Sequence, residues 1–315
     1  MKKALHKILY YPLWAVWYTL SLLPLRVHYV IGDVFYLLVA HVVKYRRRVI
    51  MKNLANAFPE KTEQERKRIM KDYYHFFCDY IAETIKFGTM SRKSIKKHMV
   101  FKNADVLAEI ANEGQSVALF LGHYGNWEWV TSIALWLEKN NRPTGYGHIY
   151  HPLENEAMDR LFLSFRNRMG STSVPMRETL RWILNHKREG RPSILGYIAD
   201  QVPTWQNIHH WLTFFNQETP VFTGVERIAR SQDQAVIYID IKRVKRGYYE
   251  GELQVVTRTP REWAENEITN ECFRRLEATI SRAPQYWLWS HNRWKRTREG
   301  FDRRYKIVNG RVIEK

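Results

Sequence analysis

A histidine and a glutamate lie close together in the segment Leu121-Gly-His-Tyr-Gly-Asn-Trp-Glu128, as His123 and Glu128. An alcohol is too weakly acidic to attack a thioester unaided, so a neutral imidazole must take its proton as the new bond forms. A carboxylate bonded to the second ring nitrogen would hold the tautomer and stabilise the imidazolium. The pair therefore predicts acyl transfer to a hydroxyl, with His123 as general base oriented by Glu128. Alternatively, His123 only ends a strand, and Glu128 favours a helix dipole.

Apolar runs and helical patterns surround this pair. Residues 116–121 form a short run typical of a buried strand, and residues 127–137 carry apolar side chains at helical spacing. The pair is therefore expected at the carboxyl end of a strand, where open α/β sheets place their sites. Helical and strand-like segments alternate over residues 104–112, 117–121, 127–138, 144–150, 153–169, 178–186 and 193–199. This alternation predicts an α/β fold with a mixed, mostly parallel sheet covered by helices.

Further elements complete the expected catalytic domain over residues 44–315. They are a long helix over residues 60–87, a β-hairpin over residues 235–242 and 249–256 that turns at Arg246-Gly247, and a closing helix over residues 263–281. Thr223 and Glu226 are expected to form a capping box at the start of another helix. No repeat or low-complexity linker divides this region, so one domain behind an N-terminal segment is expected.

The lack of other catalytic groups in the sequence favours general-base chemistry at His123. There is no Gly-x-Ser-x-Gly elbow, and Cys78 and Cys272 lack any context that suggests an activated thiol. His209 and His210 have no Cys or carboxylate at metal-ligand spacing and are expected in a loop. The sequence therefore predicts no metal site.

The net charge is the second strong feature of the chain. Its 315 residues carry a formal charge of +18, which predicts anionic partners such as nucleic acid, anionic lipid or an acidic protein. The hydrophobic content of 45% allows a sizeable core. The presence of 2 cysteines argues against a disulfide scaffold and fits a reducing compartment.

Residues 1–43 favour lipid over nucleic acid as the partner. Residues 8–25 are uncharged and rich in Tyr, Trp and Leu, and residues 29–43 form a second apolar stretch. Spanning a bilayer takes roughly 20 apolar residues, but Pro12, Pro24 and the polar breaks leave open either a single span or helices lying in the interface. Basic residues on both sides favour a hairpin or interfacial insertion with both ends cytoplasmic. No small-residue cleavage site follows, which argues against a cleaved signal peptide.

Polar residues elsewhere could complete the site. Arg166 and Arg168 near a helix end could hold phosphate or carboxylate groups, or could form a solvated helix terminus. Asp200 and Gln201 close an expected strand beside the same sheet edge, with a turn or capping role as the alternative. The Trp- and Arg-rich residues 285–296 suit an interface with lipid or nucleic acid.

Five motifs in order resemble those of the late, or secondary, acyltransferases of lipid A biosynthesis, within the lysophospholipid acyltransferase superfamily. They are the His-x4-Glu motif from His123 to Glu128, Arg166-Asn-Arg-Met-Gly170, Asp200-Gln201, Pro220-Val-Phe-Thr-Gly224 and Pro284-Gln-Tyr-Trp-Leu-Trp-Ser-His-Asn-Arg-Trp-Lys295. The resemblance covers most of the chain, including the apolar start. Many members of that group have an extended Asp-His-Asp motif where this chain has Asp200-Gln201, which leaves the acceptor open.

The resemblance implies a membrane-associated O-acyltransferase with a glycerol-3-phosphate acyltransferase-like fold. It implies transfer of a fatty acyl chain from acyl carrier protein, or acyl-CoA, to a hydroxyl of a lipid A precursor at the cytoplasmic face of the inner membrane, without a cofactor. The implied site comprises His123 as base, Glu128 as its partner, and the substrate-binding residues Arg166, Arg168, Asp200, Gln201, Asn126 and Gly125. Among these, the backbone amides near Gly125 and Asn126, or Arg166, could donate to the developing oxyanion. Acyl carrier protein, anionic membrane lipids and the phosphates of the acceptor would all favour a basic surface.

Two alternatives remain open on the sequence. An acyltransferase of the same fold could act on another phospholipid, a glycolipid or an aminolipid. A non-catalytic basic membrane or nucleic-acid binding protein would also explain the charge. No nucleic-acid-binding signature accompanies that charge, so nucleic acid is not the expected partner.

Overall fold

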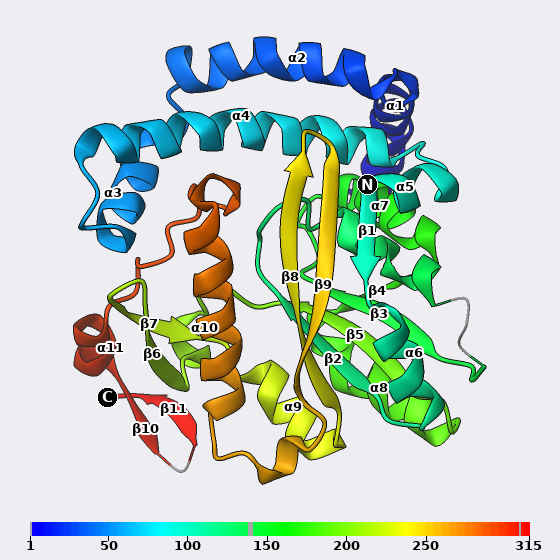
Figure 1. The fold of residues 1–315 in the computed structure, drawn as a ribbon, viewed down its shortest axis with the longest axis vertical. Coiled ribbons are helices and arrows are strands. Elements are labelled where there is room, and N and C mark those ends of the chain that lie inside the picture. The colour runs from blue at the N-terminus through cyan, green and yellow to red at the C-terminus, as the bar shows by residue number, and fades with distance from the viewer. Residues whose placement is uncertain (1, 138–140, 309) are drawn as a thin grey trace.

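The computed structural model describes residues 2–137, 141–308 and 310–315, and Figure 1 shows how its elements are arranged. The α-helices are α1 (Lys2–Leu22), α2 (Leu25–Leu37), α3 (Arg47–Ala57), α4 (Glu63–Phe87), α5 (Arg92–His98), α6 (Asp105–Asn112), α7 (Glu156–Arg166), α8 (Thr179–Arg188), α9 (Gly224–Gln232), α10 (Glu267–Arg282) and α11 (Arg298–Arg304). The strands are β1 (Met99–Lys102), β2 (Val117–Leu121), β3 (Gly145–Tyr150), β4 (Thr172–Pro175), β5 (Ser193–Ile198), β6 (His210–Phe214), β7 (Gln217–Val221), β8 (Ala235–Lys245), β9 (Tyr248–Thr257), β10 (Tyr305–Val308) and β11 (Arg311–Glu314). A π-helical turn, η1 (Leu38–Val42), continues α2, and a 3-10 helix, η2 (Trp129–Trp136), follows β2.

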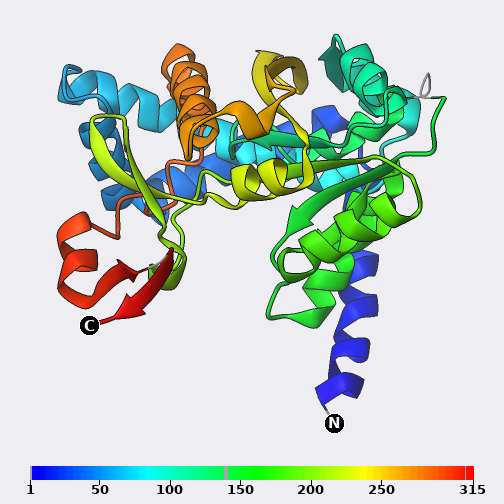
Figure 2. The same cartoon turned by 90° about the horizontal axis from the view of Figure 1, so that it is seen from below.

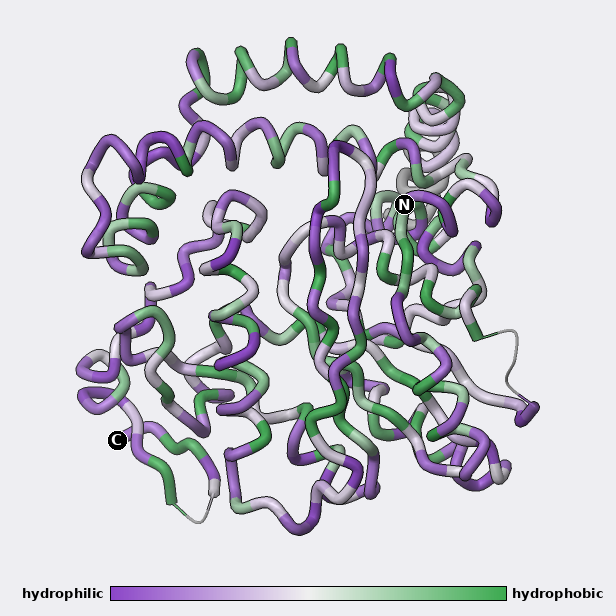
Figure 3. The backbone as a smooth tube through the Cα atoms, viewed as in Figure 1, coloured by the Kyte–Doolittle hydropathy of each residue, from purple (hydrophilic) through white to green (hydrophobic). Residues whose placement is uncertain are grey.

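One large sheet carries the fold, with strand order β1-β9-β8-β2-β5-β3-β4. Within it β8 and β9 pair antiparallel, while the other neighbouring strands pair parallel. Helices cover both faces of this sheet (Figure 2), and hydrophobic residues gather along its central strands (Figure 3). β2 is buried along its whole length, which explains its uninterrupted apolar run. The predicted mixed, mostly parallel α/β sheet is therefore confirmed.

The register of the central strands determines which side chains meet at the sheet edge. Leu121 at the end of β2 is paired with Ile198 at the end of β5, in parallel orientation. His123 follows Leu121 by two residues, and Asp200 follows Ile198 by two residues. Strand pairing therefore delivers these two polar side chains to the same place at the carboxyl edge.

The predicted long helix and hairpin are both present. α4 begins with a capping box, in which the Thr62 side chain accepts from the Glu65 N–H and the Glu65 carboxylate accepts from the Thr62 N–H. β8 and β9 form the hairpin and turn at Arg246-Gly247, where Gly247 has a φ of +75°. These elements follow from local sequence signals.

Two local predictions were wrong. The helix expected over residues 127–138 is the 3-10 helix η2 in its described part. The Thr223 side chain caps nothing, and Glu226 turns away from its own helix to the start of α10. There its carboxylate accepts hydrogen bonds of 2.7 Å from the Asn266 N–H and 2.9 Å from the Thr269 N–H. Glu226 therefore satisfies the free amides of a helix distant in sequence, which a local motif cannot reveal.

The N-terminal apolar stretches form α1 and α2, which meet at an angle near Pro24 (Figures 1 and 2). α2 lies lengthwise against α4 (Figure 1). Within the described residues, the stretch 25–42 is long and apolar enough to cross a membrane by length and composition. Such a helix fits a membrane-associated segment, as the sequence predicted.

Candidate active site

His123 and Asp200 are in direct contact at the carboxyl edge of the sheet. Asp200 Oδ1 lies 2.6 Å from His123 Nδ1, and Asp200 Oδ2 accepts a hydrogen bond of 2.9 Å from the His123 backbone N–H. Gly122 allows this approach, because a Cβ there would lie 3.1 Å from Asp200 Oδ2 and 2.6 Å from Leu276 Cδ1. A single carboxylate thus fixes both the ring and the backbone of the histidine.

The C-terminal aromatic segment, residues 285–296, also makes hydrogen bonds to both members of this pair. The Trp287 indole Nε1–H donates a hydrogen bond of 2.7 Å to Asp200 Oδ2, and the Leu288 N–H donates one of 3.1 Å to the His123 carbonyl. Trp287 is 2% exposed and Trp289 is 0% exposed, so this part of the predicted interface segment lies in the interior. Trp287 lies within the last of the five motifs, but nothing in the local sequence pattern predicts its contact with Asp200.

The environment of Asp200 keeps its carboxylate ionised. Burial alone would raise the pKa of Asp200, which is 2% exposed. Attraction to the charge that the His123 ring carries when it is protonated, together with hydrogen bonds from that ring, the Trp287 indole and the His123 backbone, outweighs burial and lowers this pKa to about 2. An ionised carboxylate against Nδ1 holds the proton of the neutral imidazole on that nitrogen.

The second ring nitrogen of His123 is then the basic one. Its neighbour is Gln201, whose side-chain nitrogen lies 3.2 Å from Nε2 and can donate to it. The His123 side chain is 18% exposed, so the site is only partly closed. A hydroxyl that displaced the Gln201 amide would meet a ring already aligned for proton transfer.

Glu128 occupies a different place from the one that the sequence predicted. It makes two hydrogen bonds with Arg166, of 2.7 Å from Nε to Oε2 and 2.5 Å from Nη2 to Oε1. The Tyr80 hydroxyl lies 3.4 Å from Glu128 Oε1. The carboxylate at Nδ1 of His123 is therefore Asp200, and Glu128 orients an arginine at the end of α7.

The backbone between the two residues explains this separation. Gly125 has a φ of +60°, a left-handed conformation that turns the chain before Glu128. The Trp127 ring then lies between, with its centroid 5.3 Å from that of His123 and 4.0 Å from that of Tyr80. His123 therefore meets the Trp127 ring edge-on, Trp127 stacks on Tyr80, and His123 and Glu128 make no direct hydrogen bond in the described structure.

Three other predicted site residues have structural partners. The Arg168 guanidinium donates to the carbonyls of Phe87 and Gly88, so Arg168 caps the C-terminal end of α4. The Gly125 N–H donates to the Tyr286 carbonyl at 3.0 Å, and this amide is thus not free for an oxyanion. Asn126 is 0% exposed, and its side chain donates to Glu83 Oε2 at 2.8 Å. In the described structure these three groups are therefore engaged in contacts within the protein.

Two histidines near the site were not predicted. His148 on β3 lies between two hydroxyls, with Nδ1 2.9 Å from Ser171 Oγ and Nε2 2.7 Å from Ser173 Oγ. Burial, followed by the positive charge of Arg166, lowers the pKa of His148 to about 4. His291 Nε2 accepts from the Val202 N–H at 3.2 Å, and burial lowers the pKa of His291 to about 4 as well. Both rings are therefore neutral near pH 7 and act as fixed hydrogen-bonding groups.

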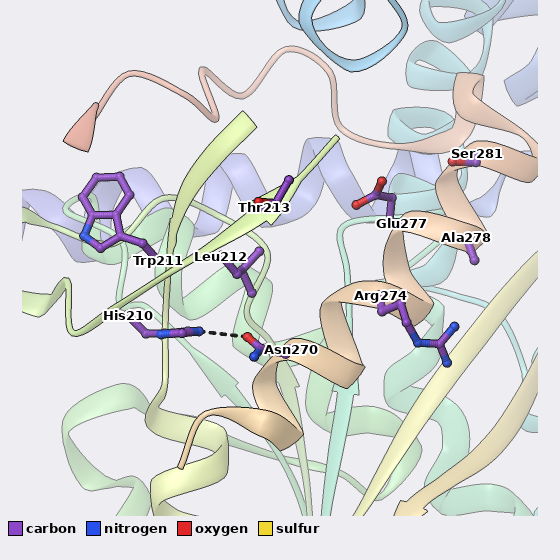
Figure 4. Close-up of a pocket in the computed structure, with 9 residues that line it drawn as sticks. All are labelled: His210, Trp211, Leu212, Thr213, Asn270, Arg274, Glu277, Ala278 and Ser281. Atoms are coloured by element: carbon purple, nitrogen blue, oxygen red, sulfur yellow. Dashed lines mark hydrogen bonds between the residues drawn. The ribbon is translucent and has the colours of Figure 1, made fainter. Parts of the chain in front are cut away.

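A cavity of about 590 Å³ lies elsewhere, between β6 and α10 (Figure 4). Its walls include Trp211, Arg274 and Glu277, and none of the residues that surround His123. His210 lies on β6, not in a loop as predicted, and its Nε2 is 2.8 Å from Asn270 Oδ1. The chemistry is better placed at the His123–Asp200 pair, because the cavity holds no base aligned by a buried carboxylate. Within the described residues, no three His, Cys, Asp or Glu side chains form a group that could hold a metal ion.

Comparisons with known proteins agree with the motifs. Residues 1–296 match the family model described as bacterial lipid A biosynthesis acyltransferase. The chain is also 20% identical over 299 residues to a lipid A biosynthesis acyltransferase of Haemophilus influenzae, and the match covers 92% of this chain and 90% of that protein. The similarity therefore extends over both the N-terminal helices and the sheet.

Proposed function

Because this chain belongs to the bacterial lipid A biosynthesis acyltransferase family and is an acyltransferase, we propose that it transfers a fatty acyl chain to a hydroxyl of a lipid A precursor. His123 is the general base, and Asp200 orients it. The observation that carries the proposal is the 2.6 Å contact between His123 Nδ1 and the buried, ionised Asp200 at the carboxyl edge of the sheet. Acyl carrier protein or acyl-CoA supplies the acyl chain at the cytoplasmic face of the inner membrane.

The reaction follows from the tautomer of His123. Nε2 takes the proton of the acceptor hydroxyl while the hydroxyl oxygen attacks the thioester carbonyl carbon. The imidazolium that forms is stabilised by Asp200, which stays ionised because its pKa is lowered to about 2. When the oxyanion collapses, the carbon–sulfur bond breaks, and Nε2 returns the proton to the leaving thiolate. The products are the new ester and the free thiol, and His123 is neutral again.

Direct transfer is favoured over a cysteine intermediate. Burial raises the pKa of the Cys78 thiol to about 12, and burial also raises the pKa of Cys272. A buried thiol with a raised pKa is a poor nucleophile, since only the thiolate attacks. The hydroxyl of the lipid acceptor is therefore the nucleophile in this proposal.

Arg166 is the substrate-positioning group in this proposal, and Glu128 holds it in place. Glu128 engages Nε and Nη2 of the guanidinium, and no hydrogen bond to Nη1 is present in the described structure. Nη1 can therefore donate to a phosphate oxygen of the acceptor or to the thioester oxyanion. The formal charge of +18 suits anionic lipids, a phosphorylated acceptor and an acidic carrier protein.

The test is acyl transfer by the purified full chain, measured as incorporation of labelled acyl chain into a lipid A precursor. His123→Ala should abolish transfer, while His151→Ala, at an exposed histidine, should leave it unchanged. Arg166→Ala should lower kcat/KM strongly, and Glu128→Gln less, because Gln can still accept from the guanidinium. Full activity of His123→Ala in a correctly folded protein would overturn the proposal.

The acceptor needs a separate measurement, because base chemistry does not depend on which lipid supplies the hydroxyl. Mass spectrometry of membrane lipids from cells with and without the protein should show one acyl chain missing from lipid A when the protein is absent. A chain missing from a phospholipid, glycolipid or aminolipid instead would refute the lipid A assignment while leaving the role of His123 intact.

A further inference from the structure

The surface of α2 that faces away from α4 is apolar along its whole length. Its exposed residues recur at spacings of three and four, which places them on one face of the helix. They are Val27, Val30, Ile31, Val34 and Phe35 on α2, continued by Leu38 and Val42 on η1, here together called the outer stripe. Val34 and Val42 are 65% and 72% exposed, and no described element covers them. So much contiguous exposed apolar surface marks an interaction site.

The opposite face of α2 is attached to the protein body. His28, Gly32 and Tyr36 are buried on this side. Asp33 pairs with Arg246 at 2.6 Å, and the Tyr29 hydroxyl donates to Glu83 at 2.9 Å. These contacts run along the helix and hold α2 lengthwise against α4 and the β8–β9 turn (Figure 1).

This attachment determines how α2 can meet a membrane. A spanning helix must cross the hydrocarbon layer end to end, and its neighbours at that depth must be apolar or paired away from lipid. Here a crossing by α2 would carry Arg246 and Lys245 at the hairpin turn into the bilayer, together with the polar surface of α4. A helix that lies in the plane of the interface buries only its outer stripe and leaves those charges in water.

Basic residues identify the kind of surface that α2 meets. Lys44, Arg47 and Arg48 are exposed and follow directly after the outer stripe, and Arg26 is exposed at its start. Lys and Arg beside an inserted apolar face are attracted to anionic headgroups. Exposed aromatic residues on α1, among them Trp14 and Tyr18, whose rings stack with centroids 4.9 Å apart, suit the headgroup level.

We propose that α2 docks flat on an anionic lipid bilayer, with the outer stripe inserted at the depth of the headgroups and with neither end of α2 crossing to the far side. This inference rests on the proposed function, because it assumes that the acceptor is a membrane lipid. The docking mode fixes the height of the catalytic domain above the bilayer, since α2 is attached to α4 along its length.

The binding test uses the full chain and vesicles of phosphatidylcholine with 30% phosphatidylglycerol. Val34→Asp should reduce vesicle binding at least tenfold, while Leu180→Asp, at a 45% exposed leucine on α8, should not change it. Wild-type binding should also fall at least tenfold on vesicles of phosphatidylcholine alone. Unchanged binding of Val34→Asp, or equal binding to both vesicles, would overturn the proposal.

A depth measurement separates the flat mode from a span. Single cysteines at positions 27, 34 and 42, labelled with a fluorophore, should all be quenched most by lipids that carry a nitroxide near the headgroup. Greatest quenching of position 34 by a mid-bilayer nitroxide, with positions 27 and 42 shallow, would show a crossing helix and refute the flat mode. Transfer to a detergent-dispersed acceptor should survive in Val34→Asp and be lost in His123→Ala, so a failure of docking and a failure of the proposed function can be told apart.

Discussion

Replacing Asp200 by Asn should invert the tautomer of His123. Two donors, the His123 backbone N–H at 2.9 Å and the Trp287 indole at 2.7 Å, point at the Oδ2 position. The amide oxygen of Asn must therefore occupy that position, and the amide NH₂ must face Nδ1. Nδ1 then becomes an acceptor, and the ring proton moves to Nε2, where the base is needed.

The expected loss of kcat is large, although Asn has nearly the same shape as Asp. A wrong imidazole tautomer lowers kcat ~10³- to 10⁴-fold where a buried aspartate orients a catalytic histidine, equivalent to about 4 to 5.5 kcal/mol in the activation free energy. The stability should change less, because the amide keeps the two bonds at the Oδ2 position. Asp200→Asn should therefore remain folded and nearly inactive.

Initial rates of acyl transfer by purified Asp200→Asn, together with ¹⁵N NMR of its imidazole nitrogens, test this prediction. Asp302→Asn, at an aspartate exposed on α11, is the matched control and should retain the wild-type rate. A rate for Asp200→Asn within tenfold of wild type, or a ring that still carries its proton on Nδ1, would contradict this prediction.

Three further predictions concern the supports of the site and the fold. Trp287→Phe should raise the pKa of Asp200, because the carboxylate loses the hydrogen bond of 2.7 Å from the indole; the pKa of Asp200 followed by ¹³C NMR tests this, and an unchanged pKa would contradict it. Glu226→Ala should lower the free energy of unfolding by about 2 to 3 kcal/mol, because the substitution leaves the backbone amides at the start of α10 without a hydrogen-bond acceptor. Urea denaturation measures this loss. A loss under about 0.5 kcal/mol would show that water replaces the carboxylate. The free energy of unfolding should fall as the pH drops from about 6.5 to 4. The pKa values of His148 and His291 are about 4 in the folded protein, so the unfolded chain takes up protons first. A urea midpoint that stays constant over this pH range would contradict the predicted loss of stability.

The sheet could be predicted from the sequence because its signals are local. The uninterrupted apolar run of β2 and the alternation of strands with helices follow from burial on both faces of a parallel sheet. Glu226 shows the limit of this reasoning. Its position suggested a cap for its own helix, but its carboxylate bonds to Thr269, which is 43 residues away. Local sequence patterns contain no information about which distant amides a buried carboxylate will reach.

The site was predictable only in part, because the contacts that assemble it join residues far apart in the sequence. His123 and Asp200 were both expected at strand ends, but their contact depends on the register of β2 and β5 and joins residues 77 positions apart. Trp287 lies 87 positions from Asp200 and carries no local sign of that bond. The pairing of His123 with Glu128 was inferred from their spacing and from the family resemblance, but the φ of +60° at Gly125 turns the two side chains apart.

The two ends of the His-x4-Glu segment therefore make separate contacts. Its first residue receives its orientation from Asp200 on one side, and its last residue holds Arg166 on the other. Trp127 lies between them in ring contact with His123. Because the segment is short and mostly buried, it fixes the position of the His123 ring relative to the Arg166 guanidinium. A longer segment could keep both the His123–Asp200 pair and the Glu128–Arg166 pair, but the distance between the two pairs would change. In the proposed mechanism, the base and the substrate-positioning arginine therefore both depend on one short motif, although its histidine and its glutamate share no hydrogen bond in the described structure.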